Sequence, residues 1–192
     1  MESELEDMYN LDLSKTPKLA RVRDLFLIGA YTGLRFSDLS HLNKNNITDH
    51  TITVKTIKTG VLVVIPKTPL VRSILEKYSG NLPKIPSNQK FNDYIKEIAK
   101  RAGITELVAI DQTKGNMTIS TSIPKYNLVS SHTARRSFAT NAFLNDVPPI
   151  QIMKITGHKT EVAFMKYIKI SQEENAHKLM SHPFFTKMVV NK

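Results

Sequence analysis

The sequence SHTARRSFATNAFLNDVPPIQIMKITGHKTEVAFMKYIKI, residues 131–170, decides the fold and holds a dense set of reactive side chains. Its pattern predicts three successive helices, the first of which begins just before His132. Two prolines at 148 and 149 open the second helix, and Gly157 ends it as a C-terminal cap. Thr160 then caps a third helix, which carries Tyr167.

The spacing within this stretch brings four side chains together. His132 and Arg135 project from one face of a first helical turn, where unpaired backbone N–H groups favour a phosphate. His158 and Tyr167 would face opposite ways on one straight helix, since nine residues at about 100° each make about 900°. The break at residues 157–160 lets His158 fold back toward Tyr167. Cations, a proton acceptor and a hydroxyl nucleophile are what attack on a phosphodiester requires.

Composition indicates one basic domain. The 192 residues carry 27 Lys and Arg against 17 Asp and Glu, a net charge of +10, which favours nucleic acid over an anionic membrane as partner. The absence of cysteine excludes disulfides and thiolate zinc sites. Because we find neither a signal peptide nor an apolar run long enough to span a bilayer, we expect a soluble, cytoplasmic protein that binds no membrane.

The first part of the chain supplies a second arginine. Residues 1–14 are interpreted as a lead-in or the end of a linker, and a helix follows from Pro17 to about Tyr31. Arg35 then begins a helix over residues 36–42, with Asp38 one turn along and able to orient it. Taken alone, Arg35 is better explained as a surface arginine paired with Asp38.

A β-hairpin follows, because β-branched residues at 51–57 and 61–66 flank a Lys-Thr-Gly turn. Lys58 lies at its tip, where an ammonium group can reach DNA and deliver a proton. Lys55 is a rival for the same role.

The remaining segments are mainly helical. Helices are predicted over residues 70–79 and 89–102, and a capping box at Ser171 and Glu174 starts a last one to about Met180. Residues 104–129 have no clean period; short strands at 108–110 and 117–120 with a turn at 114–116 are one interpretation. The tail, residues 181–192, holds Phe184 and Phe185, which either close the core or dock on a neighbouring subunit. The predicted fold is mainly α with a small antiparallel β-sheet.

Several common sites are absent from the sequence. It contains no GxxxxGK[ST] or GxGxxG loop and no HExxH motif. His132 and His158 lack carboxylates at metal-ligand spacing, so no metal or cofactor is expected.

In six stretches the sequence resembles the tyrosine recombinase (phage integrase) family, most closely the integrases of bacterial mobile elements. These are TGLRFSDL, IKTG, LPKIPSNQKFNDYIKEIAKRAGI, SHTARRSFATN, ITGH and the tyrosine nine residues beyond that histidine, in the family's order. The resemblance implies the catalytic-domain fold of these DNA breaking-rejoining enzymes. It also implies site-specific cleavage and rejoining of DNA without ATP or metal.

The resemblance implies a role for each candidate residue. Tyr167 attacks the phosphate, giving a 3′-phosphotyrosine and a free 5′-hydroxyl, while His132 assists proton transfer at the nucleophile. Lys58 is the general acid and Asp38 supports the site. The scissile phosphate is held by Arg35, Arg135 and His158, the last as a hydrogen-bond donor.

The resemblance also sets expectations for partners. Double-stranded DNA is the substrate, four protomers act on two DNA sites, and accessory DNA-bending proteins are further candidate partners. Family members usually carry an N-terminal core-binding domain, so we expect residues 1–192 to be a single catalytic domain from a longer integrase. Thr156 is a departure, because a leucine is commoner before the Gly-His pair.

Two other functions fit part of the pattern. One is a topoisomerase that uses related chemistry without choosing sites. The other is a catalytically silent DNA-binding module in which Tyr167 is a packed aromatic on an amphipathic helix.

Overall fold

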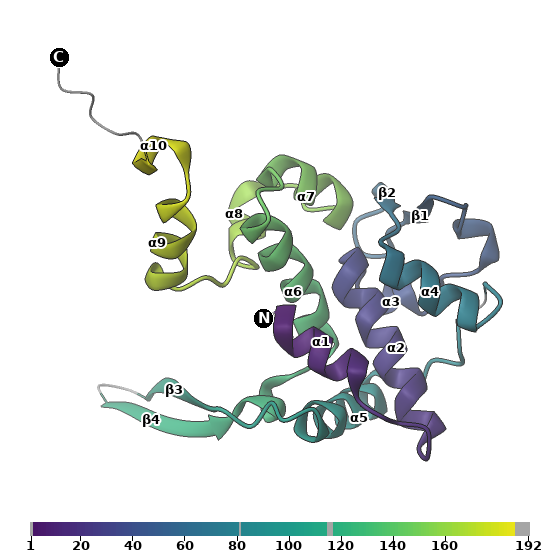
Figure 1. Ribbon diagram of the computed structural model, residues 1–192, viewed down its shortest axis with the longest axis horizontal. Helices are drawn as coiled ribbons and strands as arrows, with labels where there is room; N and C mark the ends of the chain where they lie inside the picture. The colour runs from purple at the N-terminus through teal and green to yellow at the C-terminus, as the bar shows by residue number, and fades with distance from the viewer. Residues whose placement is uncertain (1, 81, 115–116, 187–192) are drawn as a thin grey trace.

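The computed structural model describes residues 2–80, 82–114 and 117–186, and they form a mainly helical molecule with two separate antiparallel sheets of two strands each (Figure 1). The prediction of a mainly helical fold with a small antiparallel sheet is confirmed. The helices are α1 Glu2–Asn10, α2 Pro17–Thr32, α3 Phe36–Leu39, α4 Pro69–Lys77, α5 Asn88–Arg101, α6 Ser131–Leu144, α7 Pro149–Thr156, α8 Glu161–Met165, α9 Gln172–Met180 and α10 Pro183–Thr186. The strands are β1 Thr51–Lys55, β2 Leu62–Pro66, β3 Leu107–Lys114 and β4 Met117–Pro124, and short 3-10 turns lie at Lys44–Asn46 and Lys125–Leu128.

Helix α2 is the centre of the main core. Leu25, Leu27 and Ile28 are completely buried, because α2 packs against α6 and α5 and also contacts α1 and α4 (Figure 1). A Cβ at Gly29 would lie 3.3 Å from Cβ of Ala134, so α2 and α6 approach closely. This packing places the N-terminal turn of α6 beside the end of α2.

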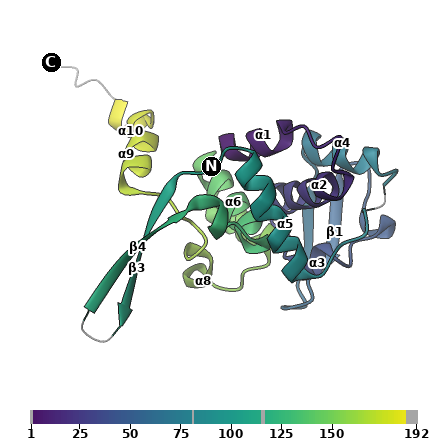
Figure 2. The same cartoon turned by 90° about the horizontal axis from the view of Figure 1, so that it is seen from below.

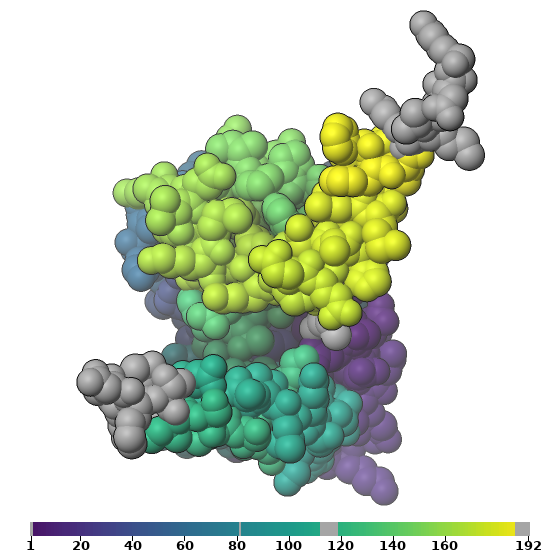
Figure 3. Space-filling model, turned by 90° about the vertical axis from the view of Figure 1, so that its left-hand side faces the viewer, coloured from purple at the N-terminus to yellow at the C-terminus, as the bar shows by residue number. Residues whose placement is uncertain are grey.

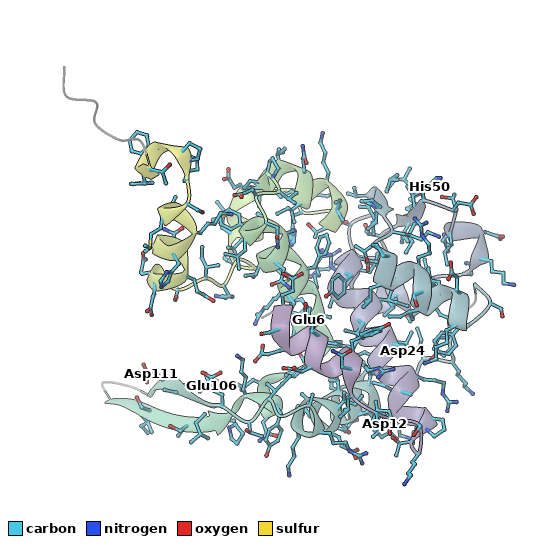
Figure 4. All side chains as sticks on the ribbon, in the orientation of Figure 1. Glu6, Asp12, Asp24, His50, Glu106 and Asp111 are labelled. Atoms are coloured by element: carbon cyan, nitrogen blue, oxygen red, sulfur yellow. The ribbon has the colours of Figure 1, made fainter. Side chains whose placement is uncertain are left out.

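A buried carboxylate ties α2 to the end of α4. Asp24, labelled in Figure 4, accepts hydrogen bonds from Lys77 Nζ at 2.7 Å, Tyr78 Oη at 2.7 Å and Arg23 Nε at 3.0 Å. Burial and the Asp24 charge raise the pKa of Tyr78, so its phenol stays a hydrogen-bond donor. Two positively charged side chains and a phenol thus donate hydrogen bonds to this buried carboxylate.

Residues 2–10 differ from the prediction of a lead-in. They form α1, whose Leu5 and Met8 are buried in the main core. These two residues, three apart, are the apolar face of an otherwise acidic helix, and such a short pattern is hard to distinguish from a linker.

The predicted hairpin at residues 51–66 is confirmed as β1 and β2. Val54 pairs with Val63, and the alternate residues Ile52, Val63 and Ile65 are buried. Its turn is stiffened by the Thr56 hydroxyl, which lies 2.7 Å from Oγ1 of Thr59.

The irregular segment at residues 104–129 contains a second hairpin. Strands β3 and β4 have eight residues each, longer than the short strands suggested by the sequence, and they project from the helical body (Figures 1 and 2). Side chains on it such as Leu107 and Ile119 are exposed, which explains the lack of a clean alternating pattern. The predicted turn lies partly outside the described residues, at 115–116.

A second, smaller hydrophobic cluster packs α6, α7 and α8 together. Ala139 of α6, Ile152 and Met153 of α7, and Phe164 of α8 form its buried centre, and Tyr167 packs at its edge. Because α6 contributes a buried residue to each cluster, it links the two clusters.

Helices α9 and α10 lie at one edge of the helical body (Figures 1 and 3). The predicted capping box of Ser171 and Glu174 is confirmed. Phe184 and Phe185 are 69% and 60% exposed, so the suggestion that they close the core is wrong. The last six residues of the tail, 187–192, lie outside the described residues. Within the described ranges, no helix combines the length and apolar character needed to cross a membrane.

Candidate active site

Two connections between helices and the N-terminus of a third segment, α6, build the candidate site. Gly33 ends α2 in the left-handed conformation, with φ of 68°, and Arg35 then precedes α3. The N-terminal turn of α6 lies beside them, and the connector from α7 to α8 closes the arrangement. Gly157 caps α7 with φ of 66°, as predicted, so His158 turns back over the helix end.

Arg135 is almost completely buried, with 1% of its surface exposed. Its Nη1 donates to the carbonyl of Gly33 and its Nη2 to the carbonyl of Thr156, both at 2.5 Å. The same Nη2 lies 3.3 Å from Nε2 of His158. Burial, with the neighbouring charge of Arg35, lowers the pKa of Arg135 to about 10, so it is still a cation at neutral pH.

Arg35 and Asp38 form a second group, joined by a long ion pair. Arg35 Nη1 lies 3.9 Å from Asp38 Oδ2, which is a charge contact only. The shorter bond of Asp38 goes to the backbone N–H of Ile57, at 2.8 Å. Asp38 therefore anchors the hairpin turn next to Lys58 more directly than it orients Arg35.

Two guanidinium N–H groups are buried without a hydrogen-bond partner among the described residues. They are Nη1 of Arg35 and Nε of Arg135. An unsatisfied buried donor costs about 1–3 kcal/mol, so each group favours an acceptor that reaches it.

Tyr167 lies just beyond the third helix. The prediction that this helix carries it is wrong, because α8 ends at Met165 and Tyr167 lies in the following turn. Thr140 Oγ1 on α6 donates to the Tyr167 carbonyl at 3.2 Å and fixes the backbone there.

The phenol of Tyr167 is surrounded by three predicted side chains. Its Oη lies 3.1 Å from Nε2 of His132, and its ring centroid lies 4.6 Å from that of His158. The guanidinium carbon of Arg135 lies 5.5 Å from the same centroid. The structure thus brings His132, Arg135, His158 and Tyr167 into one chain of contacts.

Both histidines are disfavoured as cations. Burial, then the charges of Arg136, Arg135, Arg35 and Lys58, lower the pKa of His132. Burial and the two nearest arginines lower the pKa of His158 to about 4. A neutral imidazole has one nitrogen lone pair, which suits a proton acceptor next to a phenol.

Lys58 lies in the turn between β1 and β2 and is exposed. Its charge is the smallest of the named causes that lower the pKa of His132. Lys55 is the exposed last residue of β1, paired with Leu62. The structure gives Lys58 no direct contact with the other candidate residues among those it describes.

A polar pocket of about 460 Å³ opens beside this cluster. Its lining residues come from three elements and are Arg35, Phe36, Ser37, Asn88, Asn92, Ser130, Ser131 and His132. The first amide of α6 is already used, since Ser131 N–H donates to Asn92 Oδ1 at 2.7 Å. The expectation of unpaired N–H groups at this helix end therefore fails for that amide. Sequence reasoning missed Asn92, whose polar position on an amphipathic helix carries no distinct signal.

No group of three or more histidine or carboxylate side chains in the described part of the chain is arranged to hold a metal ion.

Comparisons with known proteins identify a family and similar folds. The family model described as the phage integrase family matches residues 1–174. A search among curated proteins finds no significant match. Among solved structures, the chain superposes on XerA recombinase with a TM-score of 0.69 and 18% identity, covering 95% of this chain and 64% of that one.

Two further solved structures are similar. The catalytic domain of bacteriophage HP1 integrase gives a TM-score of 0.54 at 23% identity, covering 93% of this chain and 95% of that domain. A lambda integrase tetramer bound to a Holliday junction gives 0.58 at 18% identity, covering 88% of this chain and 47% of that one. The chain thus spans about two thirds of the XerA chain and about half of the lambda chain.

Proposed function

Because the chain belongs to the phage integrase family of tyrosine recombinases, we propose that it cleaves and rejoins DNA strands at specific sites through a covalent tyrosyl–DNA intermediate. The observation that carries this proposal is the pair of unpartnered guanidinium N–H groups on Arg35 and Arg135, together with the guanidinium carbon of Arg135 that lies 5.5 Å from the ring centroid of Tyr167. A phosphodiester supplies two non-bridging oxygens, which would satisfy one donor from each arginine.

In the proposed reaction, Oη of Tyr167 forms a bond to the phosphorus as the bond from phosphorus to the 5′-oxygen breaks. His132 accepts the phenolic proton, for which its neutral Nε2 is 3.1 Å away. Lys58 donates a proton to the leaving 5′-oxygen. Arg35 and Arg135 stabilise the negative charge that develops on the phosphate. Reversal with a second 5′-hydroxyl rejoins the strand, so phosphodiester energy is conserved.

Of the two candidate lysines, we favour Lys58 as the general acid. Its charge already acts on His132, and its turn is held by the bond from Ile57 N–H to Asp38. Lys55 lies three residues earlier and is the last residue of β1. Asp38 would act by positioning the hairpin.

We propose double-stranded DNA as the partner and a tetramer on two DNA sites as the working unit. The net charge of +10 suits a polyanion. The lambda integrase structure is a tetramer bound to a Holliday junction, which supports the assembly by analogy. Phe184 and Phe185, exposed on α10, are the proposed subunit contact.

The proposal is tested with a nicked suicide substrate, from which the cleaved end cannot return. We expect the wild-type chain at low ionic strength, in EDTA, to give a covalent protein–DNA band that Tyr167→Phe does not give. A band of equal intensity from Tyr167→Phe would contradict the assignment. No band from either protein, with DNA binding retained, would favour the silent module.

A second assay separates the recombinase from the topoisomerase. Relaxation of supercoiled plasmids that lack any attachment site, at the rate found with plasmids that carry one, would favour cleavage without site choice. We expect covalent complexes to accumulate on one sequence in preference to others.

A further inference from the structure

Thr156 occupies the position where a leucine is commoner in the family, and its hydroxyl makes two hydrogen-bond contacts. The residue is 1% exposed, at the end of α7. Its Oγ1 lies 2.7 Å from Nδ1 of His158 and 2.8 Å from the carbonyl of Ile152. A leucine would offer neither contact.

The donors and acceptors around His158 fit together in only one way. Arg135 Nη2 is always a donor, so the imidazole nitrogen 3.3 Å from it must be the acceptor. A neutral ring that accepts at Nε2 carries its proton on Nδ1, and that proton is donated to Thr156 Oγ1. The Thr156 hydroxyl then donates its own proton to the Ile152 carbonyl. The alternative, with a proton on Nε2, would set two donors against each other.

We propose that Thr156 is a positioning residue, whose hydroxyl holds His158 in the Nδ1–H tautomer so that Nε2 accepts a hydrogen bond from the phosphate-binding Arg135. This inference rests on the proposed function, because it assigns Arg135 to the phosphate. Thr156 then restrains Arg135 twice, directly through its carbonyl and indirectly through its hydroxyl and His158.

The tautomer changes the role expected for His158. In the DNA-free site, its Nε2 is an acceptor and has no proton to donate to a phosphate. The lowered pKa of His158, about 4, agrees with a neutral ring there. Donation to a phosphate oxygen through Nε2 therefore requires a second proton from solvent, taken up once the negative phosphate lies beside the ring. With Nδ1–H already bound to Thr156, Nε2 is the nitrogen that gains it.

The first test reads the tautomer directly. In ¹⁵N spectra of histidine-labelled protein at pH 7.5, assigned by the loss of signals in His158→Gln, we expect a protonated Nδ1 and an unprotonated Nε2 for His158. Thr156→Ser keeps the hydroxyl and should keep this pattern, whereas Thr156→Val removes the acceptor of the Nδ1 proton and should lower the population of the Nδ1–H tautomer. A wild-type ring with its proton on Nε2, or an unchanged tautomer in a folded Thr156→Val, would overturn the inference.

The second test reads the chemistry. We expect Thr156→Val to cleave the suicide substrate about tenfold to a hundredfold more slowly in a single turnover, since loss of positioning has effects of this size. Thr156→Ser should stay within about twofold of the wild type, since it retains the hydroxyl that positions the ring. Equal rates for the serine and valine variants would contradict the positioning role.

The two proposals fail separately. If the wild-type protein cleaves no DNA, the proposed function fails, and the tautomer is still decided by the spectra. If the wild type cleaves DNA and Thr156→Val keeps both the rate and the tautomer, only the role of Thr156 fails.

Discussion

At the scale of single residues, Arg135 links three parts of the chain that are distant in sequence. Its guanidinium binds the carbonyl that ends α2, the carbonyl that ends α7 and the imidazole of His158. Only a planar group with several N–H donors makes these bonds together. The residue proposed to bind the phosphate is therefore also part of the packing that forms the site.

We predict that Arg135→Lys lowers the free energy of unfolding by about 2–3 kcal/mol, because a single ammonium leaves buried carbonyls unsatisfied. Arg35→Lys is the matched control, since the polar contact found for its guanidinium within the described ranges is the long one to Asp38. We expect a loss below about 1 kcal/mol. Urea denaturation of both variants measures the difference. Equal losses in the two variants would contradict the claim that the hydrogen bonds of Arg135 stabilise the fold more than the contact of Arg35 does.

The lowered pKa of His158 predicts a loss of stability in mild acid. Its pKa is about 4 in the folded chain, against 6.5 for an unperturbed histidine, so between these values the unfolded state binds more protons. Titration of His158 thus costs no stability above about pH 6.5, and it lowers the free energy of unfolding as the pH falls toward 4. Because the ring is partly exposed, solvent screening reduces the effect to about 1 kcal/mol.

Denaturation at pH 7.5 and pH 5.0 measures this dependence. His158→Gln cannot take up the proton, so it should lose less stability than the wild type between the two values. A variant with the same or a larger loss would show that other groups cause it.

At the scale of elements, the end of α2 sets the position of the first arginine. Gly33 has φ of 68°, and a Cβ there would lie 2.5 Å from Cδ1 of Phe138 on α6. This glycine is required both by its conformation and by the close approach of α6. Its carbonyl also holds Arg135.

We predict that Gly33→Ala destabilises the fold by about 2–4 kcal/mol, through left-handed strain together with the clash against Phe138. Gly60→Ala is the control, because Gly60 has φ of 66° but nothing within 4 Å of a Cβ, and it should cost about 1 kcal/mol. Thermal or urea unfolding compares the two. If Gly60→Ala is as damaging as Gly33→Ala, packing against Phe138 is not the cause.

At the scale of the whole molecule, α9 and α10 contribute little to the core. Neither helix has a buried residue in the region that the structure describes. Lys178 attaches α9 to the end of α6, through the carbonyls of Phe143 and Leu144 and an ion pair with Asp146 at 2.8 Å. The ion pair is worth little, because the side chain of Asp146 is 85% exposed.

We therefore predict that deletion of residues 171–192 spares folding and weakens assembly on DNA. The unfolding midpoint should stay close to that of the full chain. On DNA with two sites, the mass of the protein–DNA complexes should fall, because fewer protomers assemble. An unfolded truncated protein, or unchanged assembly, would contradict the prediction.

The sequence predicted the helices around the site well, because prolines, glycines and capping residues mark their ends. Gly157 and Ser171 lie where the pattern placed them. It failed where tertiary contacts decide, as for the acidic helix α1 and for Asp38, whose main partner is a backbone amide of the hairpin. The role of Thr156 depends on a buried hydroxyl next to an imidazole, and spacing alone does not show it.

The central claim is that Tyr167 attacks the phosphate that Arg35 and Arg135 bind. The most direct measurement digests the covalent complex with nuclease and protease, then identifies the modified peptide by mass spectrometry. We predict a nucleotide joined through its 3′-phosphate to Tyr167, and a released strand whose 5′-hydroxyl is labelled by a polynucleotide kinase without prior phosphatase treatment. A nucleotide on another side chain, or one joined through its 5′-phosphate, would contradict the account.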